Sequence, residues 1–185
     1  GLFHSTVFIK EGCSFITFQN GEVITEGSRT SSQSMHIQIG NGLTVTSTPT
    51  SYNSNITVKG NTLHSSGNAT GTYCGIACSN RDTATADQNI LIEDNTIEDF
   101  GNYGYYGRFN SGVTIKNNTV KNNIATVNTG TKYGIYTYNS SFGSRFSPKS
   151  LNSIIGNKVE DLESPTSTSY VYGIYTINSY GKGDL

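Results

Sequence analysis

Charge and long apolar runs are both scarce in this sequence. Asp, Glu, Lys and Arg together make up 14% of the 185 residues, and the formal net charge is −1. Nucleic-acid binding needs a concentrated Lys/Arg surface, and the basic residues here are scattered, so the composition excludes a nucleic-acid partner. No run of about 18 apolar residues predicts a membrane span, so no membrane partner is expected. No segment has the apolar periodicity of an amphipathic helix either.

Cysteine is rare as well, with Cys13, Cys74 and Cys78 as its three positions. In an extended strand the last two would lie roughly 13 Å apart. That is too far for a disulfide, whose Cα atoms lie within about 7 Å of each other. Three cysteines also lack the spacing of a zinc site, and we expect buried free thiols, no metal and no cofactor. Free thiols favour assembly in a reducing cytoplasm over secretion.

The apolar content is low, at 34%, but it does not indicate disorder. Disordered chains combine a high net charge with few β-branched residues. Here the polar residues are mainly Asn, Ser, Thr and Gly, interspersed with Ile, Val and Tyr. This mixture is typical of short strands separated by frequent turns, and it predicts an all-β domain.

One local pattern recurs along the chain at irregular intervals. It consists of alternating apolar residues, a short polar step, an Asn, one further residue and then Leu, Ile or Val, as in "ITVKGNTLH" and "VTIKNNTVKN". A fixed local pattern with variable repeat length indicates a solenoid whose insertions fall in loops. Asn tolerates the left-handed backbone of a tight bend, and its amide can bond to the Asn above and below. The predicted ladder residues are Asn20, Asn41, Asn61, Asn95, Asn118 and Asn157.

A second motif supplies a third strand for each turn. It reads "CGIACSN", "YGYYGRFNS", "YGIYTYNSS" and "YGIYTINSY", and it is centred on Ile76, Tyr105, Ile135 and Ile174. With the Asn-centred bends, these strands resemble the right-handed parallel β-helix of the pectin-lyase-like superfamily, over essentially the whole chain. The resemblance implies about six coils with the short bend between the second and third strands. We expect residues 1–185 to be a single β-helix segment of a longer chain.

In that superfamily the first strand and its flanking loops usually carry the polysaccharide groove. Strand alternation points Ile135 and Ile174 inward, so the tyrosines beside them point outward. Three interpretations stay open: aromatic pairing that stabilises the sheet, a sugar-binding platform in which an arginine holds a carboxylate, and a protein interface. The predicted substrate-binding residues are Tyr106, Arg108, Tyr136, Tyr138 and Tyr175.

The candidate catalytic groups are carboxylates. Glu98 and Glu160 share a predicted outward column with His64 and Lys121. One interpretation is a charge ladder in which Lys121 lies between the two glutamates. The other is an acid/base pair about 10 Å apart, compatible with the roughly 6.5–9.5 Å carboxyl separation of inverting glycosidases, although Lys121 would lower both pKa values.

A third catalytic candidate is Asp82. It lies in the loop "NRDTATADQ", which with Arg81 and Asp87 is expected to flank the other side of the groove.

The resemblance is specific for architecture and says little about chemistry, because this fold carries lyases, hydrolases, adhesins and phage tailspikes. We expect a polysaccharide-recognising segment of a tailspike-like receptor-binding protein on a virion tail, homotrimeric in the full-length protein, with or without depolymerase activity on a bacterial surface glycan. The alternatives are a secreted polysaccharide lyase or glycoside hydrolase of this fold and a non-catalytic surface adhesin.

Overall fold

The computed structural model describes residues 4–10, 12–26, 34–40, 51–66, 72–80, 86–122, 130–138, 152–162 and 169–177. Within these ranges all the regular secondary structure consists of β-strands, and these strands form three parallel sheets. Among the same residues no helix has the length and apolarity needed to cross a membrane.

Each sheet takes one strand from every coil. Sheet A contains β1 (His4–Ile9), β4 (Ser34–Gly40), β7 (Thr72–Ser79), β10 (Phe100–Arg108), β13 (Lys132–Tyr138) and β16 (Val171–Ile177). Sheet B contains β2 (Ser14–Gln19), β5 (Ser54–Lys59), β8 (Asp87–Glu93), β11 (Asn110–Lys116) and β14 (Ser153–Ile155). Sheet C contains β3 (Glu22–Glu26), β6 (Thr62–Ser66), β9 (Thr96–Glu98), β12 (Thr119–Lys121) and β15 (Lys158–Glu160).

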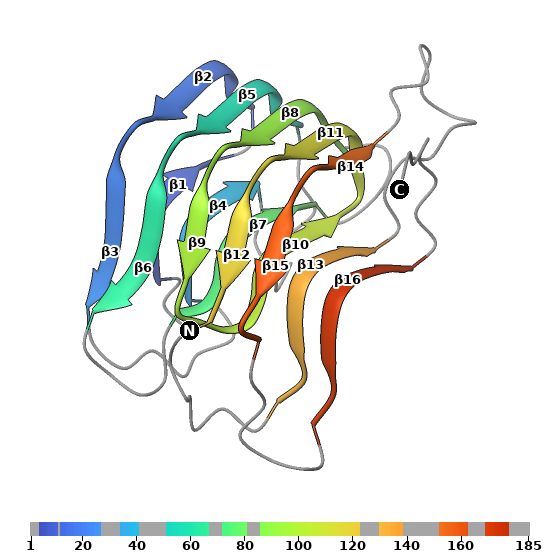
Figure 1. The fold of residues 1–185 in the computed structure, drawn as a ribbon. Helices are drawn as coiled ribbons and strands as arrows, with labels where there is room; N and C mark the ends of the chain where they lie inside the picture. Colours follow the sequence, from blue (N-terminus) through green and yellow to red (C-terminus); the bar gives the residue numbers. More distant parts are fainter. Residues whose placement is uncertain are drawn as a thin grey trace.

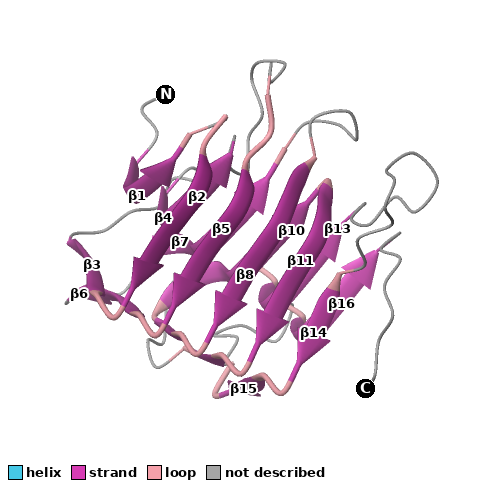
Figure 2. Ribbon diagram, turned by 90° about the horizontal axis from the view of Figure 1, so that it is seen from above, coloured by secondary structure: helices cyan, strands magenta, loops and turns pink. Residues whose placement is uncertain are grey.

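The chain therefore winds as a right-handed parallel β-helix, as predicted. In Figure 1 the coils follow one another from blue to red along the stack, and Figure 2 shows β2, β5, β8, β11 and β14 side by side. Right-handed crossovers are the rule for parallel strands of one sheet. The described part of the chain makes five coils of three strands, and β16 adds a sixth strand to sheet A.

The core is a set of apolar columns that repeats the register of the strands. Ile76, Tyr105, Ile135 and Ile174 pair across sheet A in the predicted order. The first three are fully buried, and so are the predicted core residues Ile92, Ile115 and Val120 of the other two sheets. Ile174 occupies the same inward column but is 46% exposed, because it lies on the last strand of sheet A.

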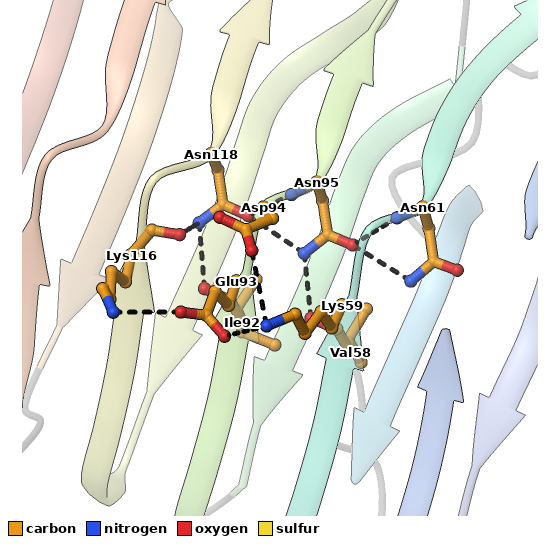
Figure 3. A network of polar contacts seen from close by, with 9 residues as sticks. All are labelled: Val58, Lys59, Asn61, Ile92, Glu93, Asp94, Asn95, Lys116 and Asn118. Atoms are coloured by element: carbon orange, nitrogen blue, oxygen red, sulfur yellow. Dashed lines mark hydrogen bonds and ion pairs between the residues drawn. The ribbon is translucent and has the colours of Figure 1, made fainter. Parts of the chain in front are cut away.

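The bend between sheets B and C carries the predicted asparagine ladder, formed by Asn61, Asn95, Asn118 and Asn157. Figure 3 shows its first three members. The Asn95 side chain accepts from the Asn61 backbone at 3.0 Å and from the Asn61 amide at 3.0 Å. Its own amide donates to Val58 O and to Asn118 Oδ1. The same bonds recur one coil further on, so each amide joins three successive coils.

One predicted ladder residue, Asn20, was assigned wrongly, and another, Asn41, lies outside the described residues. Each bend contains a left-handed residue followed by the ladder residue, and Asn20 has φ 55°, so it occupies the first position. Gly21 is in the ladder position, where its N–H donates to Asn61 Oδ1. Asn41 lies outside the described residues, but β4, which ends one residue before it, pairs with β1 and β7 in sheet A. The segment "IQIGNGLTV" therefore begins in sheet A and not in sheet B.

Replacing a ladder residue should destabilise the protein strongly. Asn95→Ala leaves the buried backbone and side-chain donors of Asn61 and the buried acceptor Val58 O without this partner, while Asn118 Oδ1 keeps only its bond from the Asn95 backbone. Because an unsatisfied buried polar group costs about 1–3 kcal/mol, we expect the free energy of unfolding to fall by roughly 3 kcal/mol. Urea denaturation measures this loss.

The matched control is the neighbouring bend position. Asn117 is exposed and has φ 54°, a conformation that glycine adopts freely, so Asn117→Gly should change the free energy of unfolding by less than about 0.5 kcal/mol. Equal losses in the two variants would contradict the role assigned to the ladder.

Candidate functional site

Two columns of tyrosines stand on the outer face of sheet A, and together we call them the tyrosine wall. Strand pairing aligns Tyr106, Tyr136 and Tyr175 in one column, as predicted from the sequence. It also aligns Tyr103, Tyr133 and Tyr172 in a second column, which the sequence analysis missed. All six are half-buried, and they lie on β10, β13 and β16, toward the red end of the stack in Figure 1.

A glycine column explains why residues three apart in one strand share a face. A Cβ atom on Gly134 would lie 2.6 Å from Gly173 O and closer still to Val159, so both Gly134 and Ile135 face the interior. Tyr133 and Tyr136, on either side of this pair, then both point outward, with ring centroids 5.0 Å apart. The recurring glycine in "YGIY" was the sequence signal for the second column.

Within each column the rings stack face to face. The Tyr103–Tyr133 and Tyr133–Tyr172 centroids are 5.1 and 5.2 Å apart, with interplanar angles of 8° and 13°. The Tyr106–Tyr136 and Tyr136–Tyr175 pairs have angles of 11° and 19°. A ring stacked between two others presents its edge and not its face. The wall is therefore suited to hydrogen bonding by hydroxyl groups more than to stacking of a sugar ring on an aromatic face.

The hydroxyl groups of Tyr106, Tyr133 and Tyr136 stay protonated at neutral pH. Burial raises the pKa of Tyr106 to about 12, against the opposing effect of Arg108. Burial also raises the pKa values of Tyr133 and Tyr136. Each of these groups keeps both a hydrogen-bond donor and an acceptor over the physiological range.

Arg108 and Tyr138 extend the wall by one position, as predicted, because they pair in register at the ends of β10 and β13. The Arg108 guanidinium carbon lies 4.9 Å from the Phe109 ring centroid and 5.8 Å from that of Tyr138. These cation–π contacts hold the guanidinium at the edge of the wall. The roles of Arg108, Tyr138 and the predicted tyrosines in binding stay predictions.

The wall is confined to the later coils. By register, Ala77 and Ser79 of β7 occupy the positions next to Tyr106 and Arg108 on the outer face of sheet A. Both are fully buried, as are Met35 and Cys74 of the same outer face, which pack against Tyr103 and Tyr106. The outer face of sheet A is therefore accessible over β10, β13 and β16 but not over β4 and β7.

The predicted catalytic glutamates lie on sheet C, in the predicted column with Lys121. Lys121 Nζ is 3.1 Å from Glu98, and this contact raises the pKa of Lys121. Glu160 is paired with Lys158 at 2.7 Å. Both carboxylates are thus held in ion pairs on a different sheet from the tyrosine wall. Lys121 lies in register between the two glutamates, as in the charge-ladder interpretation, but its ion pair is with Glu98, while Glu160 pairs with Lys158 of its own strand.

The loop that contains Asp82 lies partly outside the described residues. Asp82 and Arg81 lie outside the described residues, so the structure places neither of them. Asp87 was expected to flank the groove, but it is fully buried at the start of β8, which corrects that expectation. Its Oδ1 accepts from the Asn53 backbone at 2.8 Å, and Asn53 Oδ1 accepts from the Cys13 backbone at 3.0 Å. A second polar ladder therefore lines the corner before sheet B.

Other buried polar groups lie near these elements. Cys74 and Cys78 are buried as predicted, and burial raises the pKa of both thiols, so they stay protonated. Lys132, which the sequence analysis missed, is fully buried at the start of β13 and donates to Gly101 O. Burial lowers its pKa to about 8. Within the described ranges, no group of three or more His, Cys, Asp or Glu side chains could hold a metal ion.

Comparison with known proteins adds little to this geometry. No family model matches the chain, and no curated protein matches it either. A similar solved structure is that of the Streptococcus pneumoniae surface protein and adhesin PfbA, at 13% identity and a TM-score of 0.36. The match covers 96% of this chain and 66% of the other. At this level the similarity carries no argument about function.

The close packing around Gly134, beneath the tyrosine wall, can be tested by substitution. Gly134→Ala forces a methyl group against Val159 and the Gly173 carbonyl, so the backbone must shift. We expect a loss of about 2–3 kcal/mol in the free energy of unfolding, the usual cost of overpacking a core. Gly173→Ala is the matched control, because no atom lies within 4 Å of its Cβ position. Comparable thermal shifts for the two variants would contradict this account.

Asp87 predicts an unusual pH dependence of stability. Burial raises its pKa from 3.8 to about 6, so the folded state keeps the proton over a range where the unfolded chain has lost it. The contribution of Asp87 to stability is therefore most favourable below pH 4 and falls by about 3 kcal/mol as the pH rises past 6. Buried His36, whose pKa is lowered to about 3, contributes in the opposite direction over the same range, so the effect of Asp87 is read from the difference between the variant and the wild type. Asp87→Asn should remove that decrease and make the protein more stable at pH 7.5 than the wild type.

Urea denaturation at pH 4 and pH 7.5 measures the difference. The control is Asp94→Asn, which alters an exposed carboxylate and should leave the pH profile nearly unchanged. An Asp87→Asn effect of equal size at both pH values would show that the titration of Asp87 does not set the profile.

Proposed function

We propose that this β-helix binds a polysaccharide along the tyrosine wall, as a receptor-recognising segment of a tailspike-like protein. The observation that carries the proposal is the pair of half-buried tyrosine columns on three successive coils of sheet A. Tyrosine is amphipathic, and its hydroxyl bonds readily to the hydroxyl groups of sugars.

The periodicity of the wall supports a polymeric ligand. Neighbouring rings of one column lie 5.1 to 5.8 Å apart, so equivalent hydroxyl-bearing edges recur at every coil. A repeating chain lying along the coil axis can use the same contact several times. Several weak contacts on one chain give useful avidity even when each contributes little.

The described carboxylates favour binding over cleavage. A general acid for glycosidic cleavage must face the glycosidic oxygen, whereas Glu98 is 3.1 Å from a lysine and Glu160 is 2.7 Å from another. Neither belongs to sheet A. We therefore assign recognition, and not depolymerisation, to the described part of the chain.

The buried free thiols bear on the compartment in which the protein folds. Cys74 and Cys78 are free and buried, which suits a protein that folds in a reducing cytoplasm, as virion components do. The proposed setting is thus the virion tail, with a bacterial surface polysaccharide as the partner and a homotrimer as the assembly. A secreted enzyme or a cell-surface adhesin is the alternative.

Tyr136 is the residue that tests the proposal, because it lies between Tyr106 and Tyr175 in its column. Tyr136→Phe keeps the stacked ring and removes the hydroxyl. We expect the affinity for the polysaccharide to fall about three- to tenfold, the worth of one hydrogen bond, with the melting temperature unchanged. The affinity is measured by titration against a panel of bacterial surface polysaccharides, and the control is Tyr52→Phe, which alters an exposed tyrosine outside the wall.

Light scattering on Tyr136→Ala separates binding from assembly. If the wall were an oligomer contact, this variant would dissociate while each chain kept its affinity for the glycan. That result, or an unchanged affinity in Tyr136→Phe, would reject the wall as the binding surface.

A further inference from the structure

We infer that the polysaccharide is anionic and that Arg108 binds one of its acidic groups at the edge of the tyrosine wall. This inference rests on the proposed function, since it assigns a charge to the ligand of that same surface.

The first observation is the distribution of carboxylates. The six strands of sheet A contain no Asp or Glu. The strands of sheets B and C contain several, among them Glu93, Glu98 and Glu160. An acidic ligand on the tyrosine wall would therefore not be repelled by a carboxylate on the strands that carry the wall.

The second observation is that Arg108 differs from the lysines of the other two faces. Lys59 and Lys116 share Glu93 at 2.8 and 3.0 Å (Figure 3), while Lys121 and Lys158 each have a glutamate within 3.1 Å. None of the carboxylates that the structure describes forms an ion pair with Arg108. The positive charge of Arg108, on the face that carries the tyrosine wall, is thus not compensated by a described carboxylate.

The third observation is that the guanidinium is already held in place. It lies over the Phe109 and Tyr138 rings, and its Nε is buried without a described partner. Arg108 follows Tyr106 by two residues on the same face and pairs with Tyr138. A fixed guanidinium loses little conformational entropy on binding, and its planar fork matches a carboxylate or phosphate with two parallel hydrogen bonds. A glycan lying on the hydroxyl edges can therefore place an acidic substituent at Arg108.

The experiment compares each ligand with its own uncharged form. A panel of capsular and O-antigen polysaccharides is prepared in which every uronic-acid polymer is paired with its carboxyl-reduced form, and every phosphorylated polymer with its dephosphorylated form. The intact protein should bind an acidic member at least tenfold more tightly than its neutral form, and the pair that shows this difference identifies the anion as carboxylate or phosphate.

Arg108→Gln should weaken binding of the acidic form by about tenfold or more, as expected for the loss of a charge-assisted pair, and leave binding of the neutral form unchanged. Arg108→Lys keeps the charge without the fork and should give an intermediate affinity. Lys116→Gln, which removes a paired lysine from sheet B, should change neither. Thermal melting confirms that each variant is folded.

The possible failures are distinguishable. Equal affinity of the intact protein for charged and neutral forms, or equal weakening of both by Arg108→Gln, overturns the anionic subsite and leaves the tyrosine wall as a polysaccharide site. If the intact protein binds no member of the panel in either form, the proposed function fails and this inference fails with it.

Discussion

Hydrogen bonding between successive coils is the constraint on which this structure depends. Every strand bonds to a strand of the coil before or after it, and at the bend each ladder asparagine does the same with its side chain. The buried amide of Asn95 finds donors and acceptors on the coil before it and the coil after it, so neither the bend nor the register can shift without leaving polar groups unpaired. Residues at equivalent positions are consequently stacked in columns, and every surface feature of the protein is a column.

The columns give the three faces different chemistry. On sheets B and C, lysines and glutamates alternate along the coil axis and pair with each other, as in Lys59–Glu93–Lys116 and Glu98–Lys121. On sheet A the columns are uncharged tyrosines, with Arg108 at their edge. Ion pairs thus compensate much of the described charge on sheets B and C, whereas the described strands of sheet A carry the tyrosine wall.

The strand register and most of the core follow from the sequence alone, because columns repeat the same residue types at every coil. The failures occur where one residue type suits two environments. Asn20 fits a left-handed bend position as well as a ladder position, so the pattern could not separate it from Gly21. Gly134 turns two consecutive residues inward, which breaks strict alternation and conceals the second tyrosine column. The burial of Asp87 depends on its alignment with Asn53 in the coil before, which its polarity did not suggest.

The stabilising and binding roles of the tyrosines use different parts of the ring. The ring faces are occupied by neighbours in the column, and stacked aromatic pairs contribute about 0.5–1.5 kcal/mol each, which accounts for aromatic residues on β10, β13 and β16. Stacking does not account for the hydroxyl groups, since phenylalanine stacks equally well. Nor does partial exposure require them in this chain, because Phe8 and Phe15 are 51% and 82% exposed. The hydroxyl edges of the six tyrosines are the part of the wall that the proposed polysaccharide contact would use.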